Sequence, residues 1–351
     1  MTVHGKFNLA RAFKLTPHAV PGSKFHAKFT NFSIIQADYK TVGRHHIRAD
    51  IVIPNSLAPG KWPVIVRFHG GGLIIGDSLF PDWFPQWLLQ LAEKHSAIIV
   101  SANYRLLPES TGLDTLEDVE DLWSWLHSSQ LARILASQPR RPLELDLSRI
   151  LTAGDSAGGL LSLSLALSHP DEVRATIVAY PLIDVDDPAF AVGSSTPMFH
   201  LTEDDSSESM VDQYVYSIKP GTVVSSASPP KRMDLFGAVI QEGKFQELYK
   251  RGSEDSPHRN RLFLLRRLEA PGAKLPRGGI VIMHGTEDDL VPPRGSEKFI
   301  AKARELLKDQ QGSDRLVLTM QPGNHGFDAN AKLTDRWLSN AISGAVETWL
   351  E

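Results

Sequence analysis

A serine flanked by glycines stands where a predicted strand passes directly into a predicted helix. The run Gly154–Gly158 reads G-D-S-A-G and follows a strand that is expected to end at Ala153. Because this turn is very tight, side chains two residues before and after the serine would collide, and glycine avoids the collision. The turn exposes the serine hydroxyl at the edge of the sheet, beside a helix N-terminus whose dipole favours negative charge. Ser156 is therefore predicted to be a nucleophile.

A second glycine-rich run follows another predicted strand, Trp62–Phe68. The residues His69–Gly72 read H-G-G-G. Glycines carry no Cβ, so their backbone N–H groups can point into a cavity, where they can meet the oxygen that becomes charged during acyl transfer. We assign Gly71 and Gly72 as two donors of such an oxyanion hole, and the N–H of Ala157 as the third.

A serine nucleophile needs a general base, and the base needs a carboxylate that orients it. In chains with this kind of turn, the acid follows the serine and the histidine follows the acid. Two later predicted strands lead into residues of the right kinds, one into three adjacent carboxylates and the other into a histidine between two loop glycines. We expect His325 to be the base and Asp288 the acid. Glu287 and Asp289 stay open as alternatives for the acid.

The elements that must position these residues alternate between short apolar strands and longer helical segments, which indicates βαβ units. The predicted strands are Phe32–Lys40, His46–Pro54, Trp62–Phe68, Ala97–Tyr104, Arg149–Ala153, Arg174–Tyr180, Gly279–His284 and Arg315–Gln321. The predicted helices are Asp82–His95, Thr115–Ser137, Ala157–His169, Gly295–Leu307 and Lys332–Leu350. Thr115 and Asp118 have the spacing of an N-terminal helix cap. The sequence thus predicts an α/β fold with a mostly parallel sheet.

The segment Asp186–Arg277 interrupts this alternation. It is rich in serine and proline, contains only short helical patterns, and is too long for a simple loop. We expect residues 1–30 and 186–277 to form a cap or lid. The catalytic domain would then consist of residues 31–185 and 278–351.

The composition excludes several other kinds of protein. There is no cysteine, which rules out disulfides and thiolate chemistry, and 37 basic against 41 acidic residues give a net charge of −4, without the basic patches that bind nucleic acid. No apolar run approaches the roughly 18 residues that span a bilayer, and charged residues interrupt the N-terminus where a signal peptide needs an apolar stretch. We expect a cytoplasmic protein without a membrane span.

Two further clusters are open to more than one interpretation. Carboxylates crowd the start of one predicted helix, where they favour its dipole, and we expect no metal there: Glu117, Asp118, Glu120 and Asp121. Apolar residues follow the H-G-G-G run, and they either line an acyl pocket or form the buried face of the next helix: Leu73, Ile74, Ile75, Phe80, Trp83, Phe84 and Trp87.

Together the motifs resemble those of the hormone-sensitive-lipase-like esterases of the α/β-hydrolase superfamily. The resemblance extends from about Trp62 to Glu351 and rests on ordered motifs: His69–Gly72, the Y-R-L-L-P-E run at Tyr104–Glu109, Gly154–Gly158, the H-G-x-x-D-x-x-V-P run at His284–Pro292, and His325. It implies an eight-stranded, mostly parallel sheet with a helical cap. Many members place the acid in a D-P-L-x-D run, which this chain lacks.

The resemblance implies a serine hydrolase that cleaves small, apolar carboxylic esters through an acyl-enzyme, without a metal or other cofactor. The long cap suggests an alternative on the same scaffold, a tailoring enzyme for a complex natural product, such as a lactonase, deacetylase, chain-releasing hydrolase or cyclase. An inactive ligand receptor on this fold would lack the histidine, so the presence of His325 argues against it. The oligomeric state is left open.

Overall fold

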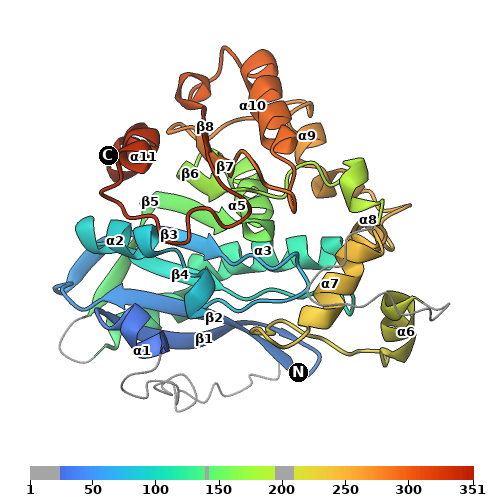
Figure 1. Ribbon diagram of the computed structural model, residues 1–351. Coiled ribbons are helices and arrows are strands. Elements are labelled where there is room, and N and C mark those ends of the chain that lie inside the picture. Colours follow the sequence, from blue (N-terminus) through green and yellow to red (C-terminus); the bar gives the residue numbers. More distant parts are fainter. Residues whose placement is uncertain (1–23, 139–141, 194–208) are drawn as a thin grey trace.

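The structure, a computed structural model, describes residues 24–138, 142–193 and 209–351. Its strands are β1 (Phe32–Val42), β2 (His45–Pro54), β3 (Gly60–Phe68), β4 (Ile98–Ala102), β5 (Leu143–Asp155), β6 (Val173–Ala179), β7 (Ile280–Gly285) and β8 (Val317–Gln321). They form one eight-stranded sheet in the order β1-β2-β4-β3-β5-β6-β7-β8 (Figure 1). β2 is antiparallel to both of its neighbours, and all other pairs are parallel. The predicted fold class is confirmed.

The central strands are apolar because both faces of the sheet are covered. In β3, the side chains of Val64 and Val66 lie in one hydrophobic cluster, and Ile65 between them lies in another. This alternation follows from the two-residue period of a strand. All eight predicted strands are present, and seven of them differ from the observed bounds by at most two residues at either end. The exception is β5, which begins at Leu143, six residues before the predicted start.

Helices cover both faces of the sheet (Figure 1). They are α1 (Lys24–Phe29), α2 (Gln86–Lys94), α3 (Gly112–Leu126), α4 (Ser129–Ala136), α5 (Ala157–Ser168), α6 (Met210–Ser217), α7 (Met233–Gln241), α8 (Phe245–Lys250), α9 (Leu264–Arg267), α10 (Arg294–Leu306) and α11 (Arg336–Leu350). Apolar residues of α3, α4, α5 and α10 belong to one cluster, and those of α2 and α11 to the other. Among the described residues, no helix is both long and apolar enough to cross a bilayer.

Three helix predictions were wrong in their bounds. The predicted helix Asp82–His95 is the 3-10 helix Pro81–Trp83 followed by α2, and the predicted helix Lys332–Leu350 begins only at Arg336. The predicted helix Thr115–Ser137 is two helices, because Ser128 accepts a hydrogen bond from the N–H of Leu131 and starts α4. The predicted cap at Thr115 was also wrong. Thr111 caps α3 instead, and its partner in the capping box is Asp114, which has the same spacing.

The predicted cap pieces are only partly described, since residues 1–23 and 194–208 lie outside the described residues. In the second piece, α6 to α9 are short helices. α8 and the 3-10 helix Arg259–Leu262 pack on α3, and α9 packs on α5 and α10. In the first piece, α1 packs beside the 3-10 helix Pro81–Trp83.

Candidate active site

Ser156 lies on a strained turn at the carboxyl end of β5. Its φ angle of 54° is in the left-handed region, which costs energy for a residue other than glycine. The turn is held by a hydrogen bond of 2.9 Å from the Ser156 N–H to the carbonyl of Ala179. The flanking glycines are required, since a Cβ on Gly154 would lie 2.3 Å from the oxygen of Gly158, and one on Gly158 would lie 2.2 Å from the oxygen of Phe68.

Three backbone N–H groups are suited to an oxyanion hole. Gly71 and Gly72 have backbone φ angles of 103° and 62°, which residues other than glycine rarely adopt. Ala157 is the first residue of α5, so its N–H has no acceptor within the helix. The N–H of Gly70, in contrast, already donates to the Asp155 carboxylate at 3.1 Å. This leaves the three predicted donors, Gly71, Gly72 and Ala157, as the candidates.

Two aromatic side chains support the loop that carries these glycines. The ring of His69 stacks on Tyr104 with 4.4 Å between centroids, and its Nδ1 lies 2.7 Å from the Gly70 carbonyl. Burial lowers the pKa of His69 to about 4, so the ring is neutral and Nδ1–H donates. At the far end of the loop, Gly76 and Ala227 exchange two backbone hydrogen bonds of 2.9 and 2.8 Å.

A buried ion pair lies beneath the serine turn. Arg67 on β3 donates through Nη2 to Asp155 at 3.1 Å, and its guanidinium covers the ring of Phe84 at 4.2 Å from the centroid. Burial raises the pKa of Asp155 to about 6, against the opposing effect of Arg67. The pair and the Gly70 bond connect the turn to the glycine loop.

His325 contacts Asp288 rather than either neighbouring carboxylate. Its Nδ1 lies 2.9 Å from Asp288 Oδ2, whereas Glu287 and Asp289 are exposed. Burial favours the neutral acid, but hydrogen bonds from His284, His325 and the backbone outweigh it and hold the pKa of Asp288 well below its usual range. Asp288 is therefore a carboxylate, and the imidazole keeps Nε2 for another partner.

A second histidine, His284, contacts the carboxylate of Asp288. His284, at the end of β7, is fully buried, and its Nε2 lies 3.2 Å from Asp288 Oδ2 and 2.9 Å from the carbonyl of Val291. A carbonyl only accepts, so Nε2 carries a proton, and Nδ1 lies 2.8 Å from the hydroxyl of Ser296. The motif contained His284, but nothing in its spacing indicated this contact.

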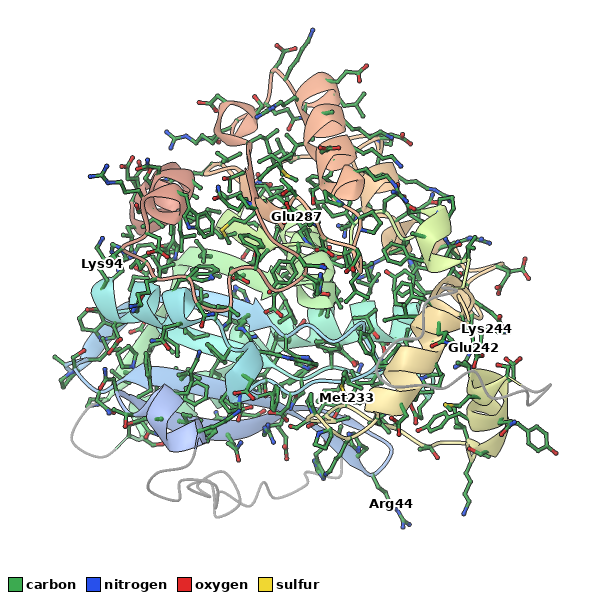
Figure 2. The ribbon with its side chains drawn as sticks, viewed as in Figure 1. Arg44, Lys94, Met233, Glu242, Lys244 and Glu287 are labelled. Carbon is green, nitrogen blue, oxygen red and sulfur yellow. The ribbon has the colours of Figure 1, made fainter. Side chains whose placement is uncertain are left out.

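The loops that carry the acid and the histidine are bonded to each other. Asn324 Oδ1 accepts from the N–H of Asp289 at 3.2 Å and from that of His325 at 2.6 Å. The N–H of Glu287 donates to the carbonyl of Gly323 at 3.0 Å, and its carboxylate accepts from the N–H of Gly323. Figure 2 shows Glu287 in the loop after β7. The sequence carried no signal for Asn324, because it acts across 35 residues.

Tyr180 was also missed. It follows β6 with a φ of 36°, and its ring lies 4.5 Å from that of His325. Its hydroxyl donates to Asp328 at 2.9 Å, and Trp87 Nε1 donates to the other oxygen at 2.9 Å. Burial raises the pKa of Asp328. The tyrosine thus packs one side of the imidazole and is itself fixed by a buried acid.

Two cavities meet at Ser156. The larger, of about 240 Å³, is also lined by His325, and the smaller, of about 130 Å³, is lined by Gly72 and Leu182. Among the described residues, no hydrogen bond joins Ser156 Oγ to His325 Nε2, and such contacts are often loose before substrate binds. The apolar residues after the glycine loop divide between the two interpretations. Trp83 and Phe84 line the larger cavity and Ile74 the smaller, whereas Trp87 lies on the buried face of α2. Leu73 and Ile75 are buried in the loop ahead of the helix, and Phe80 lines neither of these two cavities.

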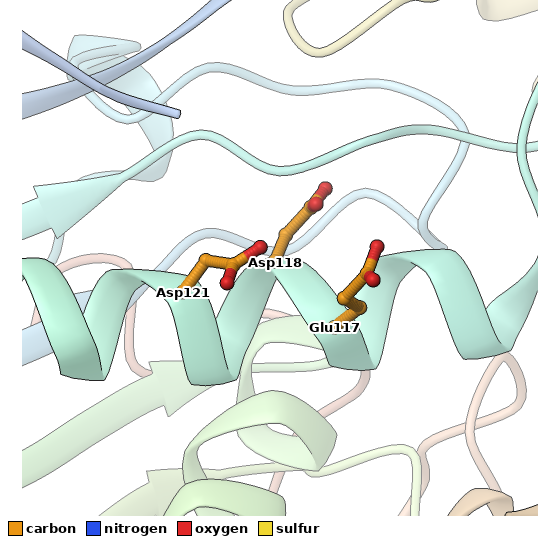
Figure 3. Close-up of side chains that lie close together, drawn as sticks. All are labelled: Glu117, Asp118 and Asp121. Carbon is orange, nitrogen blue, oxygen red and sulfur yellow. The ribbon is translucent and has the colours of Figure 1, made fainter. Parts of the chain in front are cut away.

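The acidic cluster on α3 is occupied by a side chain. Glu117, Asp118 and Asp121 point to one side of the helix (Figure 3). Lys40 places its ammonium 3.0, 2.7 and 2.6 Å from their respective oxygens, and Arg105 lies 2.8 Å from Asp118. A metal ion would have to displace the Lys40 ammonium, which already contacts all three carboxylates.

Comparisons with known proteins agree with this geometry. A model of the alpha/beta hydrolase fold family matches residues 65–254, which include both glycine-rich runs. A probable carboxylesterase, M8 of Phoma sp., is 29% identical over 92% of this chain and 98% of its own length. A second, clz11 of Cochliobolus lunatus, is 32% identical over 59% of this chain and 93% of its own length. Among solved structures, esterase LipW of Mycobacterium marinum has a TM-score of 0.56 at 18% identity and covers 93% of this chain and 83% of its own.

Proposed function

The chain belongs to the alpha/beta hydrolase family, and we propose that it hydrolyses carboxylic esters through Ser156, His325 and Asp288. Two of its relatives are named probable carboxylesterases, which supports its identification as a carboxylic ester hydrolase. The observation that supports this mechanism is the 2.9 Å contact between His325 Nδ1 and Asp288 Oδ2. His325 also lines the same cavity as Ser156.

In the first half of the reaction, Ser156 Oγ attacks the acyl carbon of the ester. His325 Nε2 takes the hydroxyl proton, and the Asp288 carboxylate stabilises the imidazolium through Nδ1–H. The carbonyl oxygen becomes an oxyanion and accepts hydrogen bonds from Gly71, Gly72 and Ala157. The C–O bond to the alcohol then breaks, and the leaving oxygen takes the proton from Nε2. The products of this half are the free alcohol and an acyl-Ser156.

In the second half, water attacks the acyl carbon and gives a proton to His325 Nε2. The same donors hold the second oxyanion, and its collapse returns the proton to Ser156 Oγ and releases the carboxylic acid. The sum is ester plus water to acid plus alcohol. No cofactor is needed, and the apolar lining of the smaller cavity supports a substrate with an apolar part.

The test is the variant Ser156→Ala with p-nitrophenyl acetate and butyrate as substrates. We expect kcat/KM to fall by a factor on the order of 10³ to 10⁶, because the covalent path is lost and only the oxyanion donors remain. A fluorophosphonate should label the wild-type chain on Ser156 and leave the variant unlabelled.

The matched control is Ser164→Ala, the same chemical change inside α5, the helix that follows Ser156, at a residue that lines neither cavity. It should keep wild-type labelling and turnover. Wild-type rates in the Ser156 variant would contradict the mechanism. Stoichiometric labelling of the wild type together with very slow turnover of all simple esters would instead favour a tailoring enzyme that acts on a complex natural product.

A further inference from the structure

One helix, α7, lines both cavities that meet at Ser156. Met233 lies in its first turn (Figure 2). Met233 lines the larger cavity, Val239 and Ile240 near the end of α7 line the smaller, and Phe236 between them lines both. The spacing of three to four residues places these side chains along one face of the helix. We propose that α7 sorts the two halves of the ester: the acyl chain enters the smaller cavity, the alcohol leaves through the larger, and Phe236 separates them.

The direction follows from the position of the histidine. In the proposed reaction, which this inference builds on, the imidazole returns its proton to the oxygen of the leaving alcohol, so the alcohol must lie on the side of His325. His325 and Gly326 line the larger cavity, and neither lines the smaller. The acyl chain must extend from the same carbonyl carbon away from the imidazole. The smaller cavity is the one on that side.

The volumes of the two cavities fit the two halves. The smaller cavity is walled mainly by apolar side chains, among them Phe190, Val239, Ile240 and Phe245, and its one carboxylate, Asp289, is exposed. The larger cavity also has a mainly apolar lining, and two of its carboxylates are already bonded: Asp155 pairs with Arg67, and Asp328 accepts from Tyr180 and Trp87. At about 130 Å³ against about 240 Å³, the cavities match esters of a short acid with a larger alcohol.

Phe236 is well placed to be the partition. A Cβ on Gly72 would lie 2.6 Å from Phe236 Cε2, so the ring stands directly against the proposed oxyanion donor. Phe236 is buried and belongs to the main core cluster. The Phe236 ring therefore separates the acyl chain from the alcohol group of a substrate bound at Ser156. Removing the ring would join the two cavities.

The experiment uses the full-length protein and two substrate series. The acyl series is p-nitrophenyl acetate, butyrate, hexanoate and octanoate, and the alcohol series is methyl, butyl, phenyl and naphthyl butyrate. Ile240→Trp should lower the ratio of kcat/KM for hexanoate to that for acetate by at least about tenfold and leave the alcohol ranking as in wild type. Met233→Trp should do the reverse, lowering naphthyl relative to methyl butyrate and leaving the acyl ranking as it was.

Phe236→Ala supplies an independent reading. With the partition removed, the preference between acetate and octanoate should flatten, because long acyl chains gain access to the larger cavity. All rates are expressed per serine labelled by the fluorophosphonate, so that a misfolded fraction does not alter a ranking. Ile240→Phe and Met233→Phe replace the tryptophan variants if those do not label.

Two results would overturn the assignment. One is an exchange of effects, in which the Ile240 variant alters the alcohol ranking and the Met233 variant the acyl ranking. The other is a set of active variants that all keep the wild-type rankings. A wild-type chain that neither labels on Ser156 nor cleaves esters would contradict the proposed function instead, so the two failures can be told apart.

Discussion

A single amide oxygen, Oδ1 of Asn324, bonds the backbone beside both the acid and the base of the proposed triad. It accepts from the N–H of Asp289 and from the N–H of His325. The distance between Asp288 and His325 is thus set partly by a residue that touches neither reacting atom. Such positioning matters because a displacement of about 1 Å can cost two orders of magnitude in rate.

We expect Asn324→Ala to lower kcat/KM for p-nitrophenyl butyrate by roughly 10- to 100-fold, with most of the change in kcat. Asn324→Asp keeps an acceptor oxygen in place and should retain more activity. A purely structural role would predict equal losses in thermal stability and activity for both variants. Full activity in the alanine variant would remove Asn324 from the positioning of the triad.

His69 gives a pH dependence whose sign can be worked out. Burial lowers its pKa from 6.5 to about 4. In unfolded chains the ring binds its proton at higher pH than in the folded protein, so the contribution to stability is present above pH 6.5 and is lost as the pH falls toward 4. The difference corresponds to about 3 kcal/mol.

The variant His69→Asn checks this, because its amide nitrogen can replace Nδ1 as donor to Gly70 but does not titrate. Between pH 7 and 4 the wild type should lose up to about 3 kcal/mol of unfolding free energy relative to the variant, measured by urea denaturation at each pH. The raised pKa of Asp155 acts in the opposite direction in both proteins and largely cancels in the difference. Parallel stability curves would contradict the neutral, buried imidazole.

At the scale of elements, α7 is fixed to the loop after β4 by a buried ion pair. Arg232, the residue before α7, donates to Glu109 at 2.8 Å, and Tyr214 of α6 donates to the other oxygen at 2.7 Å. Glu109 has only 2% of its side chain exposed. Two further nitrogens of Arg232, Nε and Nη1, are buried without a partner among the described residues. The position of α7 therefore depends on the charge of Glu109.

Glu109→Gln should destabilise the protein by about 3 kcal/mol, because it leaves the Arg232 charge buried without a counter-ion. Tyr214→Phe removes only one hydrogen bond from the same carboxylate and should cost about 1 kcal/mol. Urea denaturation measures both, and KM for p-nitrophenyl butyrate should rise in the glutamine variant as α7 loosens. Equal, small losses in the two variants would show that the pair does not fix the helix.

The elements also show where sequence patterns reach their limit. Parallel strands covered on both faces are continuously apolar, so β3 and β4 were recognisable on their own. The start of α3 was not, because Thr111 with Asp114 and Thr115 with Asp118 have the same spacing. Tertiary contacts distinguish the two pairs, because Asp118 binds Lys40 and Arg105 in the interior and is not available to cap the helix.

At the scale of the whole molecule, the predictable part of the site is the part that is local in sequence. Ser156 and the glycine loop can be recognised in the sequence because a strained turn accepts only a few residue types. The sequence favoured Asp288 as the acid but left Glu287 and Asp289 open, because only the fold brings one of the three carboxylates to His325. The partners that position the site, such as Asn324 and Tyr180, act between distant segments and leave no periodic pattern.

The bridge between Gly76 and Ala227 ties the loop that carries the proposed oxyanion donors to the segment that leads into α7. A rigid-body shift of that segment would therefore displace the donors as well. Changes in substrate range are thus more accessible through single side chains on α7 than through insertions or deletions ahead of it. Variants of this protein should therefore change their substrate preference by substitutions that leave the backbone as it is. Insertions or deletions between residues 227 and 233 should lower the catalytic rate as well as the selectivity.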